Sequence, residues 1–154
     1  MLLYKWLVRP IHLTPQLLPS WKLYGWGSNL YGEVGNSTYN NYIDPPVLLN
    51  HTQRWKYINT YMNCTSALDE NNTLYVWGSN INGMFGTGVN WNVMATPTPV
   101  DNTYTWKQVS FGVNHTMVIS TDDKLYGWGT NDYGQLGNGK TDANSEEYLS
   151  LIHI

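Results

Sequence analysis

Two side chains in the sequence have the chemistry that catalysis or metal binding requires. His115 closes a Gly-x-x-His element that begins at Gly112, and Cys64 stands at the corresponding place 51 residues earlier. An imidazole serves as a general base or metal ligand, and a thiolate as a nucleophile. His115 shares no spacing that fits a metal site with the other histidines, His12, His51 and His153. We therefore predict that His115 is structural and hydrogen-bonded to backbone, that Cys64 is a small buried residue, and that no metal or cofactor is bound.

Carboxylates also gather in short runs, at Asp69 and at Asp122-Asp123. Both runs separate two β-type segments, where Asp commonly accepts hydrogen bonds from its own backbone. No Gly-Lys-Ser/Thr follows the glycines at 137–139, as a phosphate loop would need. We predict turn chemistry at these acidic residues, no catalytic residues, and no enzymatic activity.

One pattern repeats three times and organises the chain. Leu23, Leu74 and Leu125 each begin Leu-Tyr-x-Trp-Gly-Ser/Thr-Asn, followed by Gly-x-x-Gly, at a constant period of 51 residues. A fixed period of this length indicates a repeat architecture. The sequence divides into a leader or degenerate half repeat (1–21), repeats at 22–72 and 73–123, an incomplete repeat (124–144), and a tail (145–154). The tail fits no repeat and resembles translated sequencing adapter, so we interpret it as non-native.

Each period predicts four short strands. Proline restarts the chain at Pro46 and Pro97, and an Asp/Asn-rich hairpin joins one repeat to the next. The segments 55–58 and 106–109 do not alternate cleanly, so we expect them to be largely buried. Four-stranded units that stack side by side bury both apolar faces. The expected framework positions are Trp26, Gly27, Trp77, Gly78, Trp128, Gly129, Trp55, Trp106 and His115.

The composition excludes several classes of function. Charged residues make up 12% of the 154 residues and the formal net charge is −3, so no basic surface indicates nucleic-acid binding. No segment is long and apolar enough for a transmembrane helix, and residues 1–8 make no convincing signal peptide. The localisation is therefore open, with no membrane partner expected.

The residues 125–139 and 109–118 resemble the regulator of chromosome condensation repeat, and the resemblance covers about 22–144. Members of that family form β-propellers, most often of about seven blades. The resemblance implies an all-β fold and a partial β-propeller of four-stranded antiparallel blades, as part of a longer ring. The first repeat departs from the family pattern because Tyr61 replaces Gly112 and Cys64 replaces His115.

Two variable loops follow the Gly-x-x-Gly turns at corresponding phases. Aromatic residues interleaved with asparagine are typical of binding surfaces, and Trp91 lies outside the repeated tryptophan positions. The alternative is that these rings fold back over the blade edge. The candidate interaction residues are Tyr39, Asn40, Asn41, Tyr42, Asn90, Trp91 and Asn92.

These patterns predict a non-enzymatic scaffold that presents one propeller face to another protein. The resemblance also implies an alternative, because family members include guanine-nucleotide exchange factors for a small GTPase. A second alternative is a carbohydrate-binding surface or virion protein. A further alternative is an enzyme whose active site lies in the central channel of the propeller. The predicted inner strands offer only two candidate catalytic side chains for it, Lys56 and Lys107. Open blade edges also predict self-association of the chain.

Overall fold

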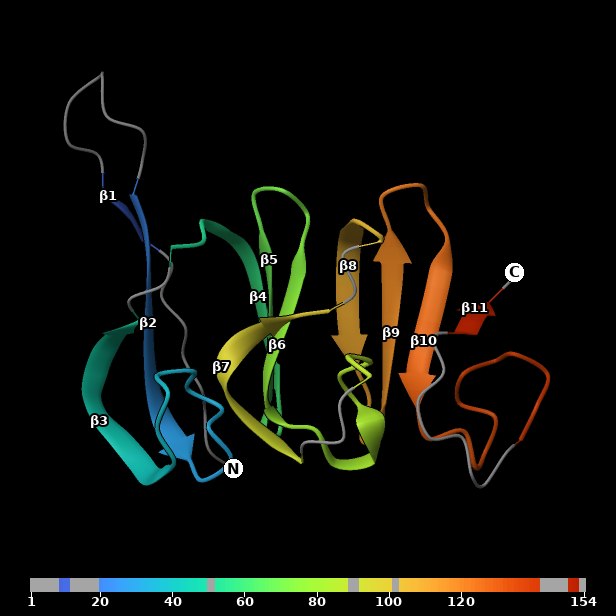
Figure 1. Ribbon diagram of the computed structural model, residues 1–154, viewed down its shortest axis with the longest axis horizontal. Coiled ribbons are helices and arrows are strands. Elements are labelled where there is room, and N and C mark those ends of the chain that lie inside the picture. The colour runs from blue at the N-terminus through green and yellow to red at the C-terminus, as the bar shows by residue number, and fades with distance from the viewer. Residues whose placement is uncertain are drawn as a thin grey trace.

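The computed structural model describes residues 9–11, 20–49, 52–88, 92–100, 103–141 and 150–152. These residues form three antiparallel sheets that stand side by side in one row (Figure 1). Their strands are β1 (Arg9–Ile11), β2 (Ser20–Asn29) and β3 (Asn40–Leu49) in the first sheet; β4 (Trp55–Tyr61), β5 (Cys64–Asp69), β6 (Leu74–Ser79) and β7 (Val93–Pro99) in the second; and β8 (Trp106–Phe111), β9 (His115–Ser120), β10 (Leu125–Gly129) and β11 (Ser150–Ile152) in the third.

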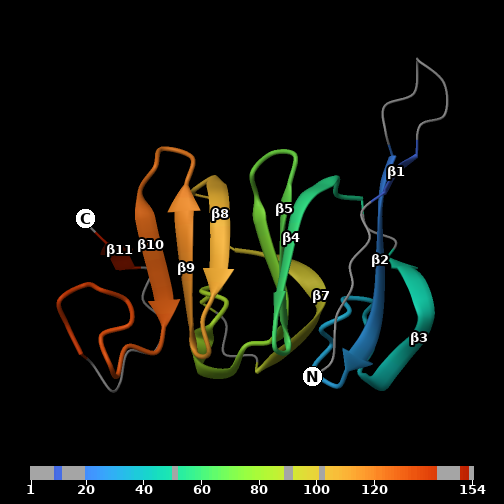
Figure 2. The same ribbon diagram turned by 180° about the vertical axis from the view of Figure 1, so that it is seen from behind.

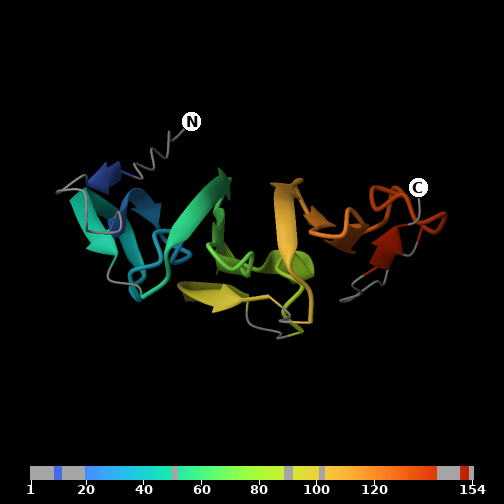
Figure 3. The ribbon, with the colours of Figure 1, turned by 90° about the horizontal axis from the view of Figure 1, so that it is seen from above.

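The architecture is that of a partial β-propeller, as the repeat predicts. Within the second sheet the spatial order is β4-β5-β6-β7, so each strand pairs with its neighbour in sequence. Viewed from above, β4 and β8 lie along one long side of the row and β7 lies along the other (Figure 3). The second sheet takes β4 and β5 from one sequence repeat and β6 and β7 from the next. The third sheet takes β8 and β9 from one repeat and β10 from the next.

The predicted hairpins between repeats are confirmed. β5 pairs with β6, and β9 pairs with β10, through antiparallel ladders. In the first hairpin, Asp69 Oδ1 accepts hydrogen bonds from the backbone nitrogens of Asn71 (2.9 Å) and Thr73 (2.8 Å). This is the turn chemistry expected of an aspartate in a connection between strands.

The prediction that segments 55–58 and 106–109 are largely buried was wrong. Trp55 and Trp106 are buried, but the next two residues in each segment are exposed. A register shift between Trp55 and Tyr57, matched in β8, places consecutive side chains in solvent. The irregular pattern therefore reflects a bulged edge strand and not a strand covered on both faces.

The outer strands begin earlier than the proline positions predict. β3 starts at Asn40 and β7 at Val93, and both run through their prolines. Proline is tolerated there because β3 and β7 are edge strands with a free side. Asn40, Asn41 and Tyr42 therefore lie in a strand, and their assignment to a loop was wrong.

Two hydrophobic cores lie between the sheets. One contains Trp55 and Trp77, and the other contains Trp106 and Trp128. The ring centroids are 5.9 Å apart in the first pair and 6.0 Å apart in the second. All four side chains are at most 1% exposed, whereas Trp26 is only half-buried. That Trp26 also belongs to a core between blades stays a prediction, because the described residues include no sheet before the first one.

The outer strand of the third sheet, β11, comes from near the end of the chain. β11 pairs antiparallel with β10, with Leu125 opposite Ile152. Three residues of the tail that was interpreted as non-native thus occupy the position that β7 holds in the second sheet. Among the described residues no helix has the length and hydropathy to cross a membrane.

Candidate interaction surface

The two ends of the row of sheets are chemically different. We call "loop end" the end that carries the loops after β2, β6 and β10 and the turns β4–β5 and β8–β9. Backbone hydrogen bonds join these turns and loops: Ser79 N donates to Asn63 O, and Thr130 N donates to Asn114 O, both at 2.8 Å. We call "hairpin end" the opposite end, which carries the hairpins β5–β6 and β9–β10 (Figures 1 and 2).

A buried asparagine holds each Gly-x-x-Gly turn at the loop end. Asn29, Asn80 and Asn131 are at most 5% exposed and recur at the 51-residue period. The Asn131 side chain accepts a hydrogen bond from Leu136 N (3.0 Å) and donates one to Lys140 O (2.8 Å). Asn29 does the same with Val34 N and Thr38 O, both at 2.9 Å. The repeat spacing identified these asparagines, but sequence reasoning assigned them no role.

Exposed hydrophobic side chains gather at the loop end. Met62 and Val113 occupy the two β-turns at corresponding repeat positions, and each is 59% exposed. Leu30 (57%) and Ile81 (48%) follow β2 and β6 at another shared position. Tyr133, in the third loop, is 91% exposed. Apolar residues at turn positions that normally favour polar residues were the available sequence signal, and sequence reasoning missed it.

The backbone of Met62 makes its presence more unusual. Met62 has φ = 49°, in the left-handed region that asparagine, aspartate and glycine adopt more readily. Its side chain lies outside both hydrophobic cores, and its backbone has a conformation that methionine rarely adopts. Strained and exposed hydrophobic residues are concentrated at binding sites, so Met62 supports an interaction role for the loop end.

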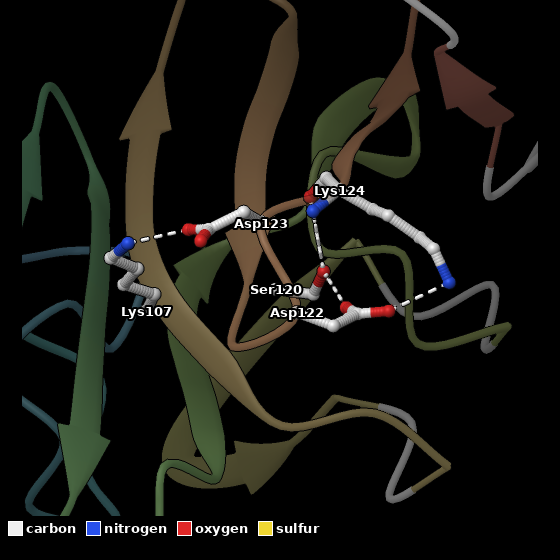
Figure 4. A network of polar contacts seen from close by, with 5 residues as sticks. All are labelled: Lys107, Ser120, Asp122, Asp123 and Lys124. Atoms are coloured by element: carbon white, nitrogen blue, oxygen red, sulfur yellow. Dashed lines mark hydrogen bonds and ion pairs between the residues drawn. The ribbon is translucent and has the colours of Figure 1, made fainter.

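The hairpin end carries charged and polar pairs instead. Lys107 Nζ lies 2.5 Å from Asp123 Oδ1, and Lys124 Nζ lies 2.7 Å from Asp122 Oδ2 (Figure 4). The Lys124 ammonium, followed by the Ser120 hydroxyl, lowers the pKa of Asp122. Arg54 and Glu70 form a looser pair at 3.5 Å on the neighbouring hairpin. These pairs are solvated and satisfied within the chain. Two exposed apolar side chains also lie toward this end, Leu48 (46%) and Tyr57 (42%), but on strands and at different repeat positions.

The predicted interaction residues fall partly on the loop end. Tyr39 (56%) and Tyr42 (70%) are exposed, at the start of β3, and Asn40 and Asn41 are exposed beside them. Asn92 is exposed, and its carbonyl accepts a hydrogen bond from Asn80 N (2.8 Å). The remaining two predicted residues, Asn90 and Trp91, lie outside the described residues.

His115 has a packing role. It begins β9, its carbonyl accepts a hydrogen bond from Gly112 N (2.8 Å), and its ring lies against Gly112. A Cβ at position 112 would collide with the ring, which explains why glycine and histidine occur together in this element. Partial burial lowers the pKa of His115, because the charged imidazolium is less well solvated there.

The Cys64 thiol is buried where the second sheet meets the loop end. Its Sγ donates to Ser79 O at 3.0 Å. Burial, with a smaller contribution from Glu33, raises the pKa of Cys64 to about 12. A thiol with that pKa is not a nucleophile at neutral pH.

The framework glycines behave alike: Gly27, Gly78 and Gly129 all have positive φ, between 96° and 104°.

On the inner strands Lys56 contacts Asn72 and Lys107 contacts Asp123, so both ammonium groups have partners. Within the described parts of the chain, no three His, Cys, Asp or Glu side chains come together as a metal site would need.

Comparisons with known families and proteins fit this framework. A sequence profile of the regulator of chromosome condensation (RCC1) repeat matches residues 71–119, and a second profile of that repeat matches residues 106–135. The chain is 31% identical over 122 residues to the protein RCC2 homolog of Xenopus laevis, covering 76% of the chain and 23% of the relative. It is 30% identical over 120 residues to the ultraviolet-B receptor UVR8 of Arabidopsis thaliana, covering 76% of the chain and 27% of the relative.

Solved structures share the fold. Human WBSCR16 superposes with a TM-score of 0.69 at 18% identity, over 85% of this chain and 32% of that one. Yeast RCC1 (Prp20), solved bound to Kap60, superposes with a TM-score of 0.67 at 21% identity, over 84% and 33%. The chain thus spans between 23 and 33% of the length of these four proteins. Three sheets built on the repeated Trp-Gly and Gly-x-x-Gly elements, together with the two profile matches, show that this chain contains RCC1-type repeats in a partial β-propeller.

Proposed function

We propose that the chain is a non-enzymatic protein-binding scaffold and that the loop end is its binding face. The observation that carries this proposal is the recurrence of exposed apolar side chains at two repeat phases, Met62 with Val113 and Leu30 with Ile81. Residues that pack a blade recur because every blade needs them. Recurrent apolar residues that remain about half exposed and lie outside both hydrophobic cores need another reason, and contact with a partner supplies one.

The chemistry of this face fits a protein better than a glycan. Methionine, valine, leucine and isoleucine supply apolar contact area, whereas sugar-binding sites rely on flat aromatic rings with polar groups around them. A carbohydrate is the second candidate ligand, because three tyrosines are exposed: Tyr39, Tyr42 and Tyr133. A glycan array on which binding is lost with Tyr133→Ser would favour that second candidate.

A small GTPase is one class of partner to include in a test. Similar proteins include a GTPase regulator homolog of Caenorhabditis elegans and a Rho GTPase-activating protein of Dictyostelium discoideum. The fold is also shared with Prp20p of Saccharomyces cerevisiae, whose binding properties to Gsp1p have been described. Binding of nucleotide-free and nucleotide-loaded GTPases by the purified chain would distinguish a regulator of that class from a general scaffold.

The test is quantitative affinity enrichment with three immobilised proteins: wild type, a loop-end variant and a hairpin-end variant. The loop-end variant carries Met62→Asn, Ile81→Ser and Val113→Ser; asparagine suits the positive φ at position 62. The control carries Glu70→Gln and Lys107→Gln, which leave the net charge unchanged.

We expect specific partners to be enriched by the wild type and the control and lost from the loop-end variant. Far-ultraviolet circular dichroism and thermal melting of all three proteins establish that the variants are folded. Partners retained by the loop-end variant but lost from the control would contradict the proposal and place binding at the hairpin end.

A further inference from the structure

Two asparagines in the chain are followed directly by glycine: Asn82 by Gly83, and Asn138 by Gly139. Both pairs lie at the loop end, in the loops after β6 and β10. Asparagine before glycine is chemically labile, because a glycine without a Cβ lets its backbone nitrogen approach the asparagine side chain. The two pairs have the same composition but different surroundings, and the difference decides which of them can react.

The first pair occupies a turn whose backbone favours it. Asn82 and Gly83 have φ of 64° and 66°, so two consecutive residues are in the left-handed region. Asparagine adopts that region more readily than most residues with a side chain. The corresponding positions hold Tyr31 and Tyr133 in the other repeats, and neither has a positive φ. The labile pair therefore follows from the conformation of this one turn.

This turn is also accessible and loosely held. Asn82 is exposed, and none of the residues of the 3-10 turn Ile81–Gly83 (η1) is buried. Within the described part of the chain, the Asn82 side-chain amide makes no hydrogen bond. The Gly83 nitrogen donates to Asn80 O at 3.2 Å, at the long end of the range for such bonds. The turn can thus open locally while both hydrophobic cores stay packed.

The second pair is held in place by its side chain. Asn138 is half-buried, and its Oδ1 accepts hydrogen bonds from Asn131 Nδ2 and from Lys140 N, both at 3.0 Å. Asn131 is the buried asparagine that holds this loop. Turning the Asn138 amide toward the Gly139 nitrogen would break both bonds and disturb that asparagine. The fold therefore protects Asn138 and leaves Asn82 unprotected.

We propose that Asn82 is a site of spontaneous deamidation at the loop end. The Gly83 backbone nitrogen loses its proton to hydroxide and attacks Cγ of the Asn82 side chain. The bond from Cγ to the side-chain nitrogen breaks, ammonia leaves, and a cyclic imide remains. Water then opens the imide at either carbonyl, which gives aspartate or isoaspartate. Overall one water is consumed and one ammonia is released, without an oxidant or a cofactor.

The product places a carboxylate among the apolar residues of the loop end. Ile81 directly precedes the site, and the turn that carries Met62 is joined to the same loop by the bond from Ser79 N to Asn63 O. Isoaspartate also lengthens the backbone of the turn, because the chain then runs through the side-chain carbon. We expect weaker contact with an apolar partner as the protein ages, and this consequence rests on the proposed function.

The experiment is incubation of the full chain at neutral and at mildly alkaline pH, followed over time by peptide mass mapping. Replacement of the amide NH2 by OH is read from the mass, and enzymatic methylation specific for isoaspartate identifies that product. We expect Asn82 to react at least about tenfold faster than Asn138, the ratio that two retained hydrogen bonds impose. Alkaline pH should accelerate the reaction, because the attacking nitrogen must lose its proton.

Two controls separate the effect of the fold from that of the sequence. In concentrated urea both loops are unfolded, so Asn82 and Asn138 should react at similar rates. Asn82→Gly removes the side-chain amide and suits the positive φ, so it should abolish the isoaspartate signal at this turn in a folded protein. Equal rates at the two asparagines in the folded wild type, or a faster reaction at Asn138, would overturn the proposal.

The effect on binding is measured separately, so that deamidation is tested without any partner. Affinity enrichment compares fresh and aged wild type with fresh and aged Asn82→Gly protein. We expect partners to be lost on ageing from the wild type only. Equal recovery by fresh and aged wild type would overturn the effect on binding, whereas the mass measurement decides on the modification site itself.

Discussion

At the scale of single residues, much of what first suggests chemistry is used for packing. His115 and Cys64 hold corresponding repeat positions but solve different local problems. The His115 ring covers a glycine at the sheet edge, and the Cys64 thiol is buried and donates to Ser79 O. This repeat position therefore accepts either histidine or cysteine, provided that the residue three positions earlier leaves space for the side chain. That earlier residue is Gly112 before His115 and Tyr61 before Cys64.

The pairing of Gly112 and His115 predicts a coupled effect of substitutions. Gly112→Ala should destabilise the chain by about 1–3 kcal/mol, because the new methyl group overlaps the imidazole. In the double variant Gly112→Ala/His115→Ala most of that cost should be recovered. Urea denaturation of the two single variants and the double variant checks this, and additive effects would show that the two residues act independently.

The pKa of Cys64 predicts a dependence of stability on pH. The folded thiol has a pKa of about 12 against a reference value of 9.0, so the unfolded chain loses this proton first as pH rises. The contribution of Cys64 to stability is complete below pH 9 and declines between pH 9 and 12. Cys64→Ser should flatten this decline relative to the wild type, measured by urea denaturation at several pH values. Equal slopes in both proteins would contradict the burial of the thiol.

At the scale of elements, the loop after each Trp-Gly strand depends on one asparagine, and the hairpin at the other end depends on no single pair. Asn131 bonds to backbone on both sides of its loop, at Leu136 and Lys140, and is 1% exposed. The Lys107–Asp123 pair has side chains that are 60% and 71% exposed. Buried hydrogen bonds to backbone contribute more to stability than solvated ion pairs do.

This difference predicts unequal costs for two alanine substitutions. Asn131→Ala should lower the free energy of unfolding by about 2 kcal/mol or more, because two backbone groups lose their partner. Lys107→Ala should lower it by less than about 1 kcal/mol. Denaturation in urea, with and without added salt, measures both. A larger loss for Lys107→Ala would mean that the hairpin end, and not the asparagine-held loop, sets the stability.

The sequence predicts those elements that recur at the 51-residue period. The period places Trp77 and Trp128 in equivalent surroundings, so the blades and the hairpins between repeats are predictable from spacing alone. The exposure of Trp26 is not, because it depends on what precedes the first sheet. The bulge in β4 also escapes prediction, since one shifted residue exposes Lys56 and Tyr57 without any glycine or proline to mark it.

The candidate surface was only partly predictable for a similar reason. Tyr39 and Tyr42 stand out in sequence as aromatics among asparagines, and both are exposed. Met62 and Val113 do not, because a single apolar residue between two strands is easily taken for part of a strand. Only the strand boundaries place them in turns, at the same end of the row as Leu30 and Ile81.

At the scale of the whole molecule, stability should depend on the contacts between neighbouring sheets, which include hydrogen bonds from buried tryptophans. Trp128→Phe removes the N–H that donates to the Met84 carbonyl and should cost about 1–2 kcal/mol. Trp26→Phe is the matched control: with no described acceptor, it should cost much less in dilute solution. Thermal and urea denaturation at low protein concentration make the comparison. Equal losses for both variants would show that the ring, and not its N–H, determines the contribution.

The loop end as binding face is the central functional claim, and an affinity measurement with one purified partner tests it most directly. Isothermal titration of that partner should show at least about tenfold weaker binding to the variant with Met62→Asn, Ile81→Ser and Val113→Ser. Binding to the variant with Glu70→Gln and Lys107→Gln should equal that of the wild type. Unchanged affinity in the loop-end variant, with a loss in the hairpin-end variant, would contradict the account.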